Sequence, residues 1–442
     1  MLTRMRCVFF IAAICLLLAA SGQATVTSAA TGTGNQGLQA GWVIDDNGSL
    51  SFPHSYTSQL PIIQEAGPGW IRVNFRLGNN GCYKDWTSVG CTGKTAIQQY
   101  RTFIDAAIAP PPDGPGLKVL GLLSNESWNG GQDQWIVNSA ERNKRGTGDN
   151  AYIDAFTTNA AVVLMGEFQG KVTVWQVWNE PNAYTANPAP GVYTGVTFIY
   201  PSNFAQLLQH VYTASRGLGV TIVSGAMVSL DSSGVARTVN GKKVQVFSDY
   251  RRALTEPQDE LQAQETADGQ NKRFPPRKVT PAPTPTKTPA PPIGCSTSAS
   301  AANYLACTYS KGQQYAGWKA GAYPLDLVGQ HIYVDQWALT TAAKLQTKLS
   351  DVRSVYVAFE GSNTPKKTVI TEIGWATNNV SLAAQAANLQ TAYQTFAGVA
   401  YLDRAYWFAN QDTPESALYY GLVDGDAAHK LSFTAYQTYA AY

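Results

Sequence analysis

The sequence predicts an α/β fold in which eight parallel strands close into a (β/α)8 barrel. Eight apolar runs are continuous instead of alternating, which is typical of strands covered on both faces. Several of these runs are separated by stretches with apolar residues at spacings of three and four, which indicate helices. Two of the runs, moreover, end in a glutamate, Glu180 and Glu372. Parallel strands in a barrel end on a shared face, so these two carboxylates are expected to meet there.

The predicted elements follow one another as βα units. The strands are Leu38–Ile44, Trp70–Phe75, Leu117–Leu123, Val172–Trp178, Val220–Ala226, Leu325–Tyr333, Thr368–Ile373 and Arg404–Phe408. Helices are expected at Thr95–Ala107, Ala151–Phe168, Ser202–Leu218, Ser381–Ala400 and, as the last barrel helix, Lys430–Tyr442. A doubly wound open sheet is the alternative, but no glycine-rich phosphate loop follows the first strand. This order therefore favours the closed barrel.

The N-terminal residues 1–30 have the pattern of a signal peptide. Arg4 and Arg6 precede an apolar stretch from Cys7 to Ala20, and small residues continue to Ala30. The apolar stretch is shorter than the ~20 residues that a membrane span needs. An uncleaved N-terminal anchor is the alternative. We expect a secreted, extracellular protein with no membrane span after signal removal, and residues 31–442 as its barrel domain.

Composition excludes some classes of partner. The net charge is +2 and charged residues make up 14% of the chain, so there is no basic field for nucleic acid. No motif for a metal or for another cofactor is present, and neither is expected. The 11 Trp and 23 Tyr suit a groove that binds sugars, and they suit a large core equally well. We expect a monomer.

The cysteines predict local disulfide bonds. Cys7 and Cys15 belong to the predicted signal peptide. The remaining four form two close pairs in loop-like sequence, Cys82 with Cys91 and Cys295 with Cys307, and these are the favoured bridges among three connectivities. A zinc site is the alternative, but no histidine lies nearby at ligand spacing.

One connection is much longer than a βα unit requires. About a hundred residues separate Ala226 from Leu325, where about thirty would suffice. We interpret 251–320 as an insertion between strands five and six. Its middle, 274–292, is rich in proline and threonine and cannot form a helix or a central strand. We expect an extended, disordered surface segment there, either without function or serving as a lid or groove wall beside the active site.

Two motifs carry a resemblance to a known family. Val177-Trp178-Asn179-Glu180-Pro181-Asn182 and Val369-Ile370-Thr371-Glu372-Ile373-Gly374-Trp375 resemble the fourth- and seventh-strand signatures of clan A glycoside hydrolases. The chain looks most similar to family 39-like or family 5-like enzymes, such as β-xylosidases and cellulase-like endoglycosidases. The resemblance covers the barrel from Leu38 to Tyr442 but not the Pro/Thr-rich segment. It implies an O-glycosidase with a TIM-barrel fold that acts on a poly- or oligosaccharide.

The resemblance implies distinct roles for the two glutamates. Glu180 would be the acid/base and Glu372 the nucleophile of a retaining enzyme, which needs its two carboxyl groups ~5–5.5 Å apart. Two nearby carboxylates raise one another's proton affinity, which favours a protonated Glu180. An ion pair or a helix cap is the structural alternative for either residue.

Five further residues are candidates for substrate binding: Asn179, Arg72, His331, Tyr333 and Trp407. Asn179 resembles the clan's ligand of the sugar 2-hydroxyl, and Trp407 its aromatic floor. Alternation places His331 and Tyr333 on one side of the sixth strand. By resemblance, the tyrosine hydrogen-bonds the nucleophile and the histidine lies beside the acid or the sugar. Arg72, inside an apolar strand, must be paired, and the clan's arginine here holds the nucleophile. Asn74 or Arg76 is the alternative mouth-facing residue.

Weaker interpretations remain for two segments and for the activity. The run Asn125-Glu126-Ser127-Trp128 after strand three either lines the groove or forms a polar surface loop, and Trp42 and Asp45 have the same status. A non-catalytic glycan-binding barrel, and a transglycosylase that uses the same covalent intermediate, are the alternatives to a hydrolase. The sugar, its linkage and endo or exo action do not follow from the sequence.

Overall fold

A computed structural model of the chain describes part of its 442 residues. The described ranges are 36–41, 43–44, 56–77, 81–111, 114–128, 151–183, 197, 199, 201–230, 236–239, 242–245, 300–319, 321–414 and 418–440. The predicted signal peptide, the Pro/Thr-rich segment, Trp42 and Asp45 lie outside them. No helix within these ranges is long and apolar enough to cross a membrane.

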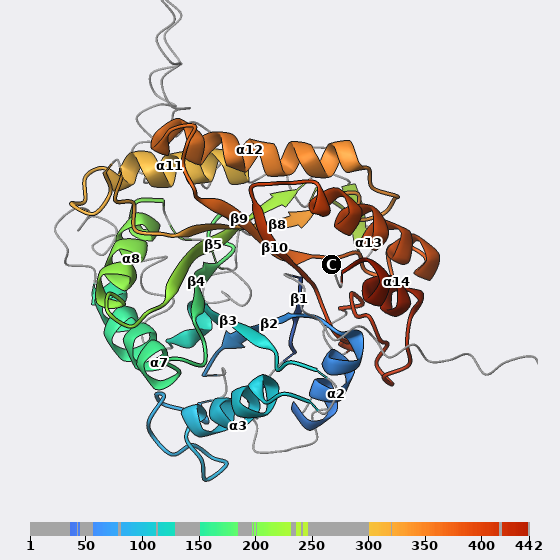
Figure 1. The fold of residues 1–442 in the computed structure, drawn as a ribbon, viewed down its shortest axis with the longest axis horizontal. Helices are drawn as coiled ribbons and strands as arrows, with labels where there is room; N and C mark the ends of the chain where they lie inside the picture. The colour runs from blue at the N-terminus through green and yellow to red at the C-terminus, as the bar shows by residue number, and fades with distance from the viewer. Residues whose placement is uncertain are drawn as a thin grey trace, which may run out of the picture.

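Eight parallel strands close into a barrel, as predicted (Figure 1). They are β1 (Gly37–Gln39), β2 (Trp70–Phe75), β3 (Lys118–Leu123), β4 (Val174–Asn179), β5 (Thr221–Leu230), β8 (Leu327–Tyr333), β9 (Lys367–Ile373) and β10 (Leu402–Trp407). The ring is closed by parallel pairing of β1 with β10 and with β2. Each of the eight predicted strands is present, and the first is shorter than predicted.

Helices surround the barrel and alternate with its strands (Figure 1). The α-helices are α2 (Tyr56–Ala66), α3 (Ala96–Ile108), α6 (Ala151–Phe156), α7 (Val162–Glu167), α8 (Pro201–Ala214), α11 (Ala301–Gly312), α12 (Ala342–Glu360), α13 (Leu382–Ala397) and α14 (Leu431–Tyr439). A π-helical turn, η2 (Thr157–Ala161), joins α6 to α7. Side-chain caps begin several helices; Thr95 and Gln98 form a reciprocal capping box at α3.

The long connection between β5 and β8 contains part of the barrel itself. Helix α11 lies within the 251–320 range predicted as an insertion, yet it packs against α8 and α12 in the outer ring. The range predicted for the insertion therefore includes a barrel helix. A short antiparallel hairpin, β6 (Ala236–Val239) with β7 (Lys242–Gln245), also belongs to this connection.

Side chains divide into a small inner cluster and a large outer one. The inner cluster fills the barrel with one residue from each of six strands: Trp70, Leu120, Val174, Val223, Val369 and Tyr406. The outer cluster lies between the strands and the helices. Alternation along each strand assigns residues to one cluster or the other. The inner apolar layer closes the barrel below the polar side chains at its mouth.

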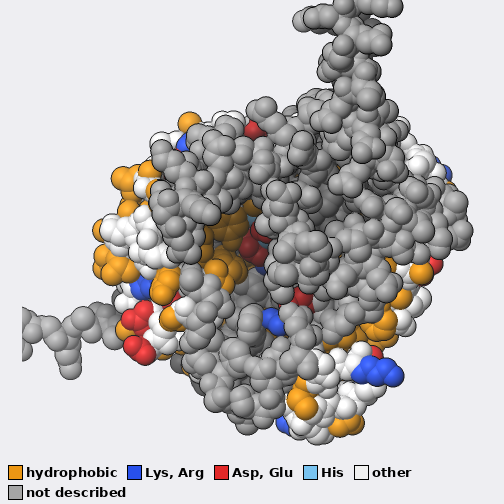
Figure 2. Space-filling model, turned by 180° about the vertical axis from the view of Figure 1, so that it is seen from behind, with side chains coloured by type: hydrophobic (Ala, Val, Ile, Leu, Met, Phe, Trp, Pro, Cys, Tyr) orange, Lys and Arg blue, Asp and Glu red, His pale blue; other side chains and the backbone are white. Residues whose placement is uncertain are grey.

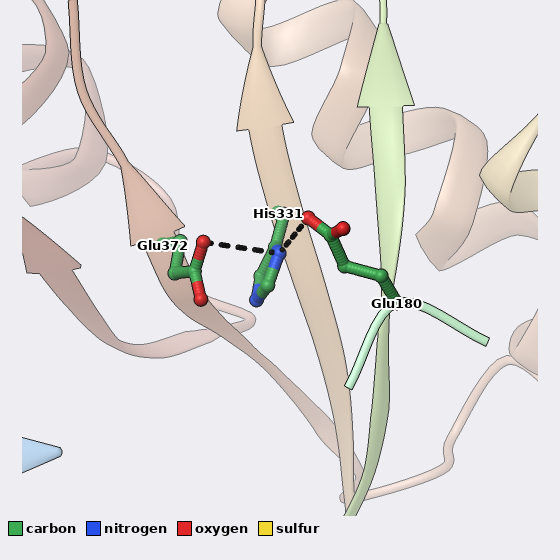
Figure 3. A group of neighbouring side chains, drawn as sticks. All are labelled: Glu180, His331 and Glu372. Carbon is green, nitrogen blue, oxygen red and sulfur yellow. Dashed lines mark hydrogen bonds and ion pairs between the residues drawn. The ribbon is translucent and has the colours of Figure 1, made fainter. Parts of the chain in front are cut away.

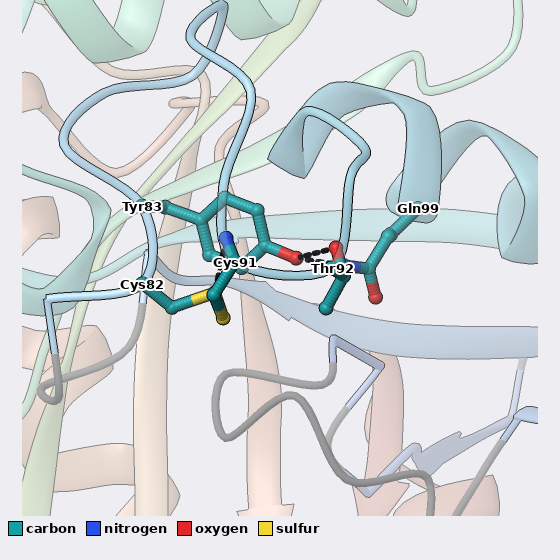
Figure 4. The surroundings of a disulfide bond; sticks show 5 residues. All are labelled: Cys82, Tyr83, Cys91, Thr92 and Gln99. Atoms are coloured by element: carbon teal, nitrogen blue, oxygen red, sulfur yellow. Dashed lines mark hydrogen bonds between the residues drawn. A yellow bond between two sulfur atoms is a disulfide. The ribbon is translucent and has the colours of Figure 1, made fainter.

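A disulfide bond joins Cys82 to Cys91, as predicted, in the segment between β2 and α3 (Figure 4). Beside it, the Tyr83 hydroxyl and Thr92 Oγ1 are 2.8 Å apart, and Gln99 of α3 donates a hydrogen bond to Thr92. The bridge thus closes the loop on itself, and the hydrogen bond from Gln99 joins that loop to helix α3. The second predicted bridge stays a prediction, because Cys295 lies outside the described residues; Cys307 is buried on α11.

Removal of this bridge should cost stability. We expect a Cys82→Ser/Cys91→Ser variant to lose about 2–3 kcal/mol of unfolding free energy, because the unfolded chain gains the freedom of the opened loop. Urea denaturation followed by fluorescence measures the loss. An unchanged denaturation midpoint in the double variant would contradict the expectation.

Candidate active site

A cavity of about 280 Å³ opens where the carboxyl ends of the strands converge. From the side opposite to Figure 1, the surface is hollowed near its middle, and charged side chains are visible inside the hollow (Figure 2). The cavity is lined by Gln39, Ala40, Gly41, Arg72, Asn74, Leu122, Asn179, Glu180, Glu372, Phe408, Ala409, Asn410, Gln411, Thr413, Leu418 and Tyr420. Both predicted glutamates therefore border one space.

Arg72 on β2 is the centre of a buried hydrogen-bond network. Only 1% of the residue is exposed, and its guanidinium donates to side chains on three other strands. The acceptors are Gln39 (2.7 Å), Gln176 (2.9 Å), Asn179 (2.8 Å) and Glu372 (2.6 Å). A buried arginine without partners would cost several kcal/mol, so this set of acceptors is what allows Arg72 to lie there.

A β-bulge on β9 aims Glu372 into the barrel. Gln330 of β8 pairs with Ile370 but the next residue, His331, pairs with Glu372, so β9 contains one extra residue. Its pairing with β10 shows a shift in the same place. Val369 lies in the inner cluster and Ile373 in the outer one, an arrangement that unbroken alternation forbids. The extra residue turns Glu372 to the inner face, a known use of bulges.

Glu372 is held as an anion. Besides Arg72, it accepts a 2.8 Å hydrogen bond from the Tyr333 hydroxyl, and His331 Nδ1 lies 3.4 Å from its Oε2. Burial raises the pKa of the Glu372 carboxyl, but the charges of His331 and Arg72 and the bond from Tyr333 outweigh it, so this pKa lies below its ordinary value. Burial, followed by the charge of Glu372, raises the pKa of Tyr333 well above its ordinary value. Tyr333 therefore remains a donor.

Glu180 projects from a tight turn at the end of β4. Trp178 and Glu180 both have positive φ, 78° and 42°. Residues other than glycine adopt this backbone region at a cost of about 1–3 kcal/mol. The turn is stabilised by the Glu180 carbonyl, which accepts hydrogen bonds from Thr197 Oγ1 (2.9 Å) and from the Ala183 amide (2.9 Å). About 26% of the Glu180 side chain is exposed, compared with 10% for Glu372.

His331 lies between the two glutamates (Figure 3). Its Nδ1 is 2.9 Å from Glu180 Oε1 and 3.4 Å from Glu372 Oε2. One carboxylate oxygen of each glutamate and this nitrogen all lie within 4.8 Å of one another. Such a set of donors could also hold a divalent cation, although the positive charge of Arg72 against Glu372 opposes one.

Asn179 is oriented by the same arginine. Its Oδ1 accepts from Arg72, which leaves the amide nitrogen as the donor toward the cavity that Asn179 lines. Further along the turn, Asn182 bonds to Val228 of β5 in both directions, at 3.0 and 2.8 Å. The motif from Trp178 to Asn182 is therefore anchored on both sides of Glu180.

Trp407 is the predicted site residue that neither lines the cavity nor contacts the two glutamates. It is fully buried in the outer cluster, where it packs against Trp375 at 6.0 Å between ring centroids. Tyr406 before it belongs to the inner cluster, and Phe408 after it lines the cavity. The residue with the expected position is thus one place further along the chain. His331 and Tyr333 reach the glutamates without appearing in the cavity lining.

Sequence reasoning also missed several polar residues of the site. Gln39 and Gln176 accept from Arg72, and Asn410 lines the cavity. Period-two alternation from Arg72 places Asn74, named in the prediction as an alternative mouth-facing residue, on the inner face, where it lines the cavity and donates to Glu126 at 3.1 Å. Gln176 could have been found in the same way from Val174. No comparable signal marks Asn410, which follows the end of β10.

Solved structures with the same barrel fold are known, although no protein-family model and no curated protein matches this chain. GH5_18 from Streptomyces cattleya in complex with GlcNAc superposes with a TM-score of 0.52 at 12% identity, covering 92% of this chain and 80% of that one. A variant of GH5_18 in complex with Manb1-4GlcNAc gives 0.51 at 13% identity, covering 91% and 80%. These similarities confirm the predicted (β/α)8 fold.

A third similar structure is a larger protein. The family 39 glycoside hydrolase from Bacteroides cellulosilyticus WH2 has a TM-score of 0.48 at 14% identity. The match covers 92% of this chain but 63% of the family 39 protein, so this chain spans less than two thirds of that length.

Loss of the Tyr333 hydroxyl should make Glu372 easier to protonate. In Tyr333→Phe the anion loses a hydrogen bond, so we expect the pKa of Glu372 to rise. Because the folded-state pKa is depressed, ionised Glu372 stabilises the fold above its unfolded pKa, and this contribution disappears as pH falls through the folded pKa. In the variant it should disappear at higher pH. Carbon-13 NMR titration of the Glu372 carboxyl measures the change.

Tyr420→Phe is the matched control for this titration. Its ring lies 6.0 Å from that of Tyr333, but its hydroxyl donates to Gln336 instead of to Glu372. A rise of the same size in both variants would contradict a specific role for the Tyr333 hydroxyl.

Proposed function

We propose that this chain is a secreted retaining glycoside hydrolase that cleaves β-glycosidic bonds of a poly- or oligosaccharide. The observation that carries the proposal is the pair Glu180 and Glu372, whose nearest carboxylate oxygens lie within 4.8 Å of one another at the mouth of the barrel. Retaining enzymes have carboxyl groups ~5–5.5 Å apart, whereas inverting enzymes need ~6.5–9.5 Å to admit a water between them.

The environments of the two carboxylates support different roles in a double displacement. Glu372 is ionised and fixed, as a nucleophile should be. Glu180 is more exposed and borders the cavity, where it can reach a leaving group. This division corresponds to the roles that the motif resemblance implies.

In the first step, a Glu372 oxygen attacks the anomeric carbon. The bond from that carbon to the glycosidic oxygen breaks, and the departing oxygen takes the proton of Glu180. In the second step, a water gives a proton back to Glu180 and attacks the same carbon, which breaks the bond to Glu372. Two inversions at one carbon give net retention.

Neighbouring groups support this chemistry without reacting. His331 Nδ1 lies close to both carboxylates, so it can keep a hydrogen bond with Glu180 both before and after Glu180 gives up its proton. The amide nitrogen of Asn179 is available for the sugar 2-hydroxyl, a contact that strengthens in the transition state. Phe408 and Tyr420 line the cavity with aromatic rings, which suit the apolar faces of a sugar.

The sugars bound in two structures of similar fold support the same proposal. GH5_18 was solved with GlcNAc and with Manb1-4GlcNAc, so that protein binds oligosaccharide in a barrel of this fold. The predicted signal peptide supports export. Neither the sugar nor the length of the substrate is part of the proposal.

Substitution of the nucleophile is the direct test. Glu372→Ala should lower kcat/KM on an activated aryl β-glycoside by more than the ~10²–10⁴-fold that proton transfer supplies. Azide can occupy the vacated space and attack in one step, so it should restore turnover and give an inverted glycosyl azide. Turnover and product are followed by phenol release and NMR, after a screen of aryl glycosides and polysaccharides has found a substrate.

Glu126→Ala is the control. Glu126 also lies after a barrel strand, but it contacts Asn74 and Arg76 and not the pair. We expect a loss below about tenfold that azide does not restore. Full activity of Glu372→Ala, or saccharide binding by the wild type without any hydrolysis, would overturn the proposal.

A further inference from the structure

The side chain of Gln176 is fully buried and contacts both Arg72, which holds Glu372, and the turn that presents Glu180. It lies on β4, four residues before Glu180, with 0% of its surface exposed. Its Oε1 accepts from Arg72 Nε at 2.9 Å, and its Nε2 donates to the carbonyl of Trp178 at 2.9 Å. One amide therefore connects the arginine that holds Glu372 to the backbone turn that presents Glu180.

The Trp178 carbonyl is a sensitive point of that turn. It belongs to the peptide that joins Trp178, with φ of 78°, to Asn179, and Glu180 follows with φ of 42°. Such conformations persist only where surrounding contacts enforce them. On the side-chain side, the Trp178 indole donates to the Thr197 carbonyl at 2.6 Å. On the main-chain side, the bond from Gln176 fixes the direction of the peptide plane.

We propose that Gln176 is a positioning residue that sets the orientation of the acid/base Glu180 relative to the nucleophile Glu372. This inference rests on the proposed glycosidase function. Gln176 does not line the cavity and acts only through Arg72 and through the Trp178 peptide. The hydrogen bonds of Gln176 to Arg72 and to the Trp178 carbonyl come from one amide group, so neither can shift without the other. Gln176 therefore fixes the spacing of the two carboxylates from inside the barrel.

Gln39 is the matched control that the chain offers. Its Oε1 also accepts from Arg72, at 2.7 Å, but its Nε2 donates to the carbonyl of its neighbour Ala40. Gln39 thus shares the contact with the nucleophile's arginine and lacks the contact with the turn of Glu180. The variants Gln176→Glu and Gln39→Glu both keep an acceptor for Arg72 and both lose the donor.

Leaving-group dependence separates the two effects. From a 2,4-dinitrophenyl glycoside the dinitrophenolate leaves without taking up a proton. From a phenyl glycoside the phenol needs a proton from the general acid to leave. We expect Gln176→Glu to lower kcat/KM on the phenyl glycoside about tenfold more than on the dinitrophenyl glycoside, a part of the ~10²–10⁴-fold that a general acid supplies. Gln39→Glu should lower both to a similar extent, because the hydrogen bonds of Gln39 go to Arg72 and Ala40 and not to the turn that presents Glu180.

A pH profile gives a second readout. Both variants place a new carboxylate on Arg72, so both should move the acidic limb of kcat/KM to higher pH. Only Gln176→Glu should also change the limb that reports the acid. Circular dichroism and melting curves test whether both variants are folded. If Gln176→Glu is unfolded, Gln176→Met replaces it in the experiment, because this change removes both hydrogen bonds without adding a charge.

The outcomes distinguish this inference from the function it rests on. Equal losses on both glycosides, with an unchanged basic limb, would overturn the positioning role while leaving the glycosidase intact. A wild-type protein that hydrolyses neither glycoside nor any polysaccharide in the screen would instead overturn the proposed function.

Discussion

The buried guanidinium of Arg72 is the interaction on which the arrangement of this site depends. From β2 it reaches β1, β4 and β9, and its four acceptors come from parts of the chain as far apart as Gln39 and Glu372. A cation so deeply buried requires acceptors on every side, and only a closed barrel brings those strands around one point. The fold and the arginine thus depend on each other, because the ring brings the acceptors together and the arginine fixes Glu372 and Asn179 among them.

Fixing one carboxylate gives the pair its asymmetry. Glu372 is surrounded by Arg72, Tyr333 and His331, and these keep its pKa low despite burial. Within the described part of the chain, Glu180 is joined to the same network through His331 and through the backbone of its turn. Two chemically identical side chains therefore experience different surroundings a few ångströms apart, which is the condition for assigning acid and nucleophile to different residues.

Much of the fold, and most of the site, could be predicted from the sequence. The eight strands were identifiable because each is an apolar run covered on both faces, and Glu180 and Glu372 because motifs mark them. The bulge at Thr371 and the positive φ of Trp178 could not be predicted, since both depend on pairing with neighbouring strands. Trp407 shows how this affects a prediction. At the end of a strand, neighbouring residues face opposite sides, so Trp407 lies in the core and Phe408 lines the cavity in the position expected for Trp407. The connection between β5 and β8 contains a further helix of the ring, α11, inside the range predicted as an insertion.

The central claim is that Glu180 and Glu372 lie at the separation used for double displacement. The stereochemistry of the product tests it most directly. Proton NMR during hydrolysis of a β-glycoside should show the β-anomer of the new reducing sugar first, with the α-anomer appearing later by mutarotation. An α-anomer formed first would mean a single displacement by water and would contradict the proposed double displacement.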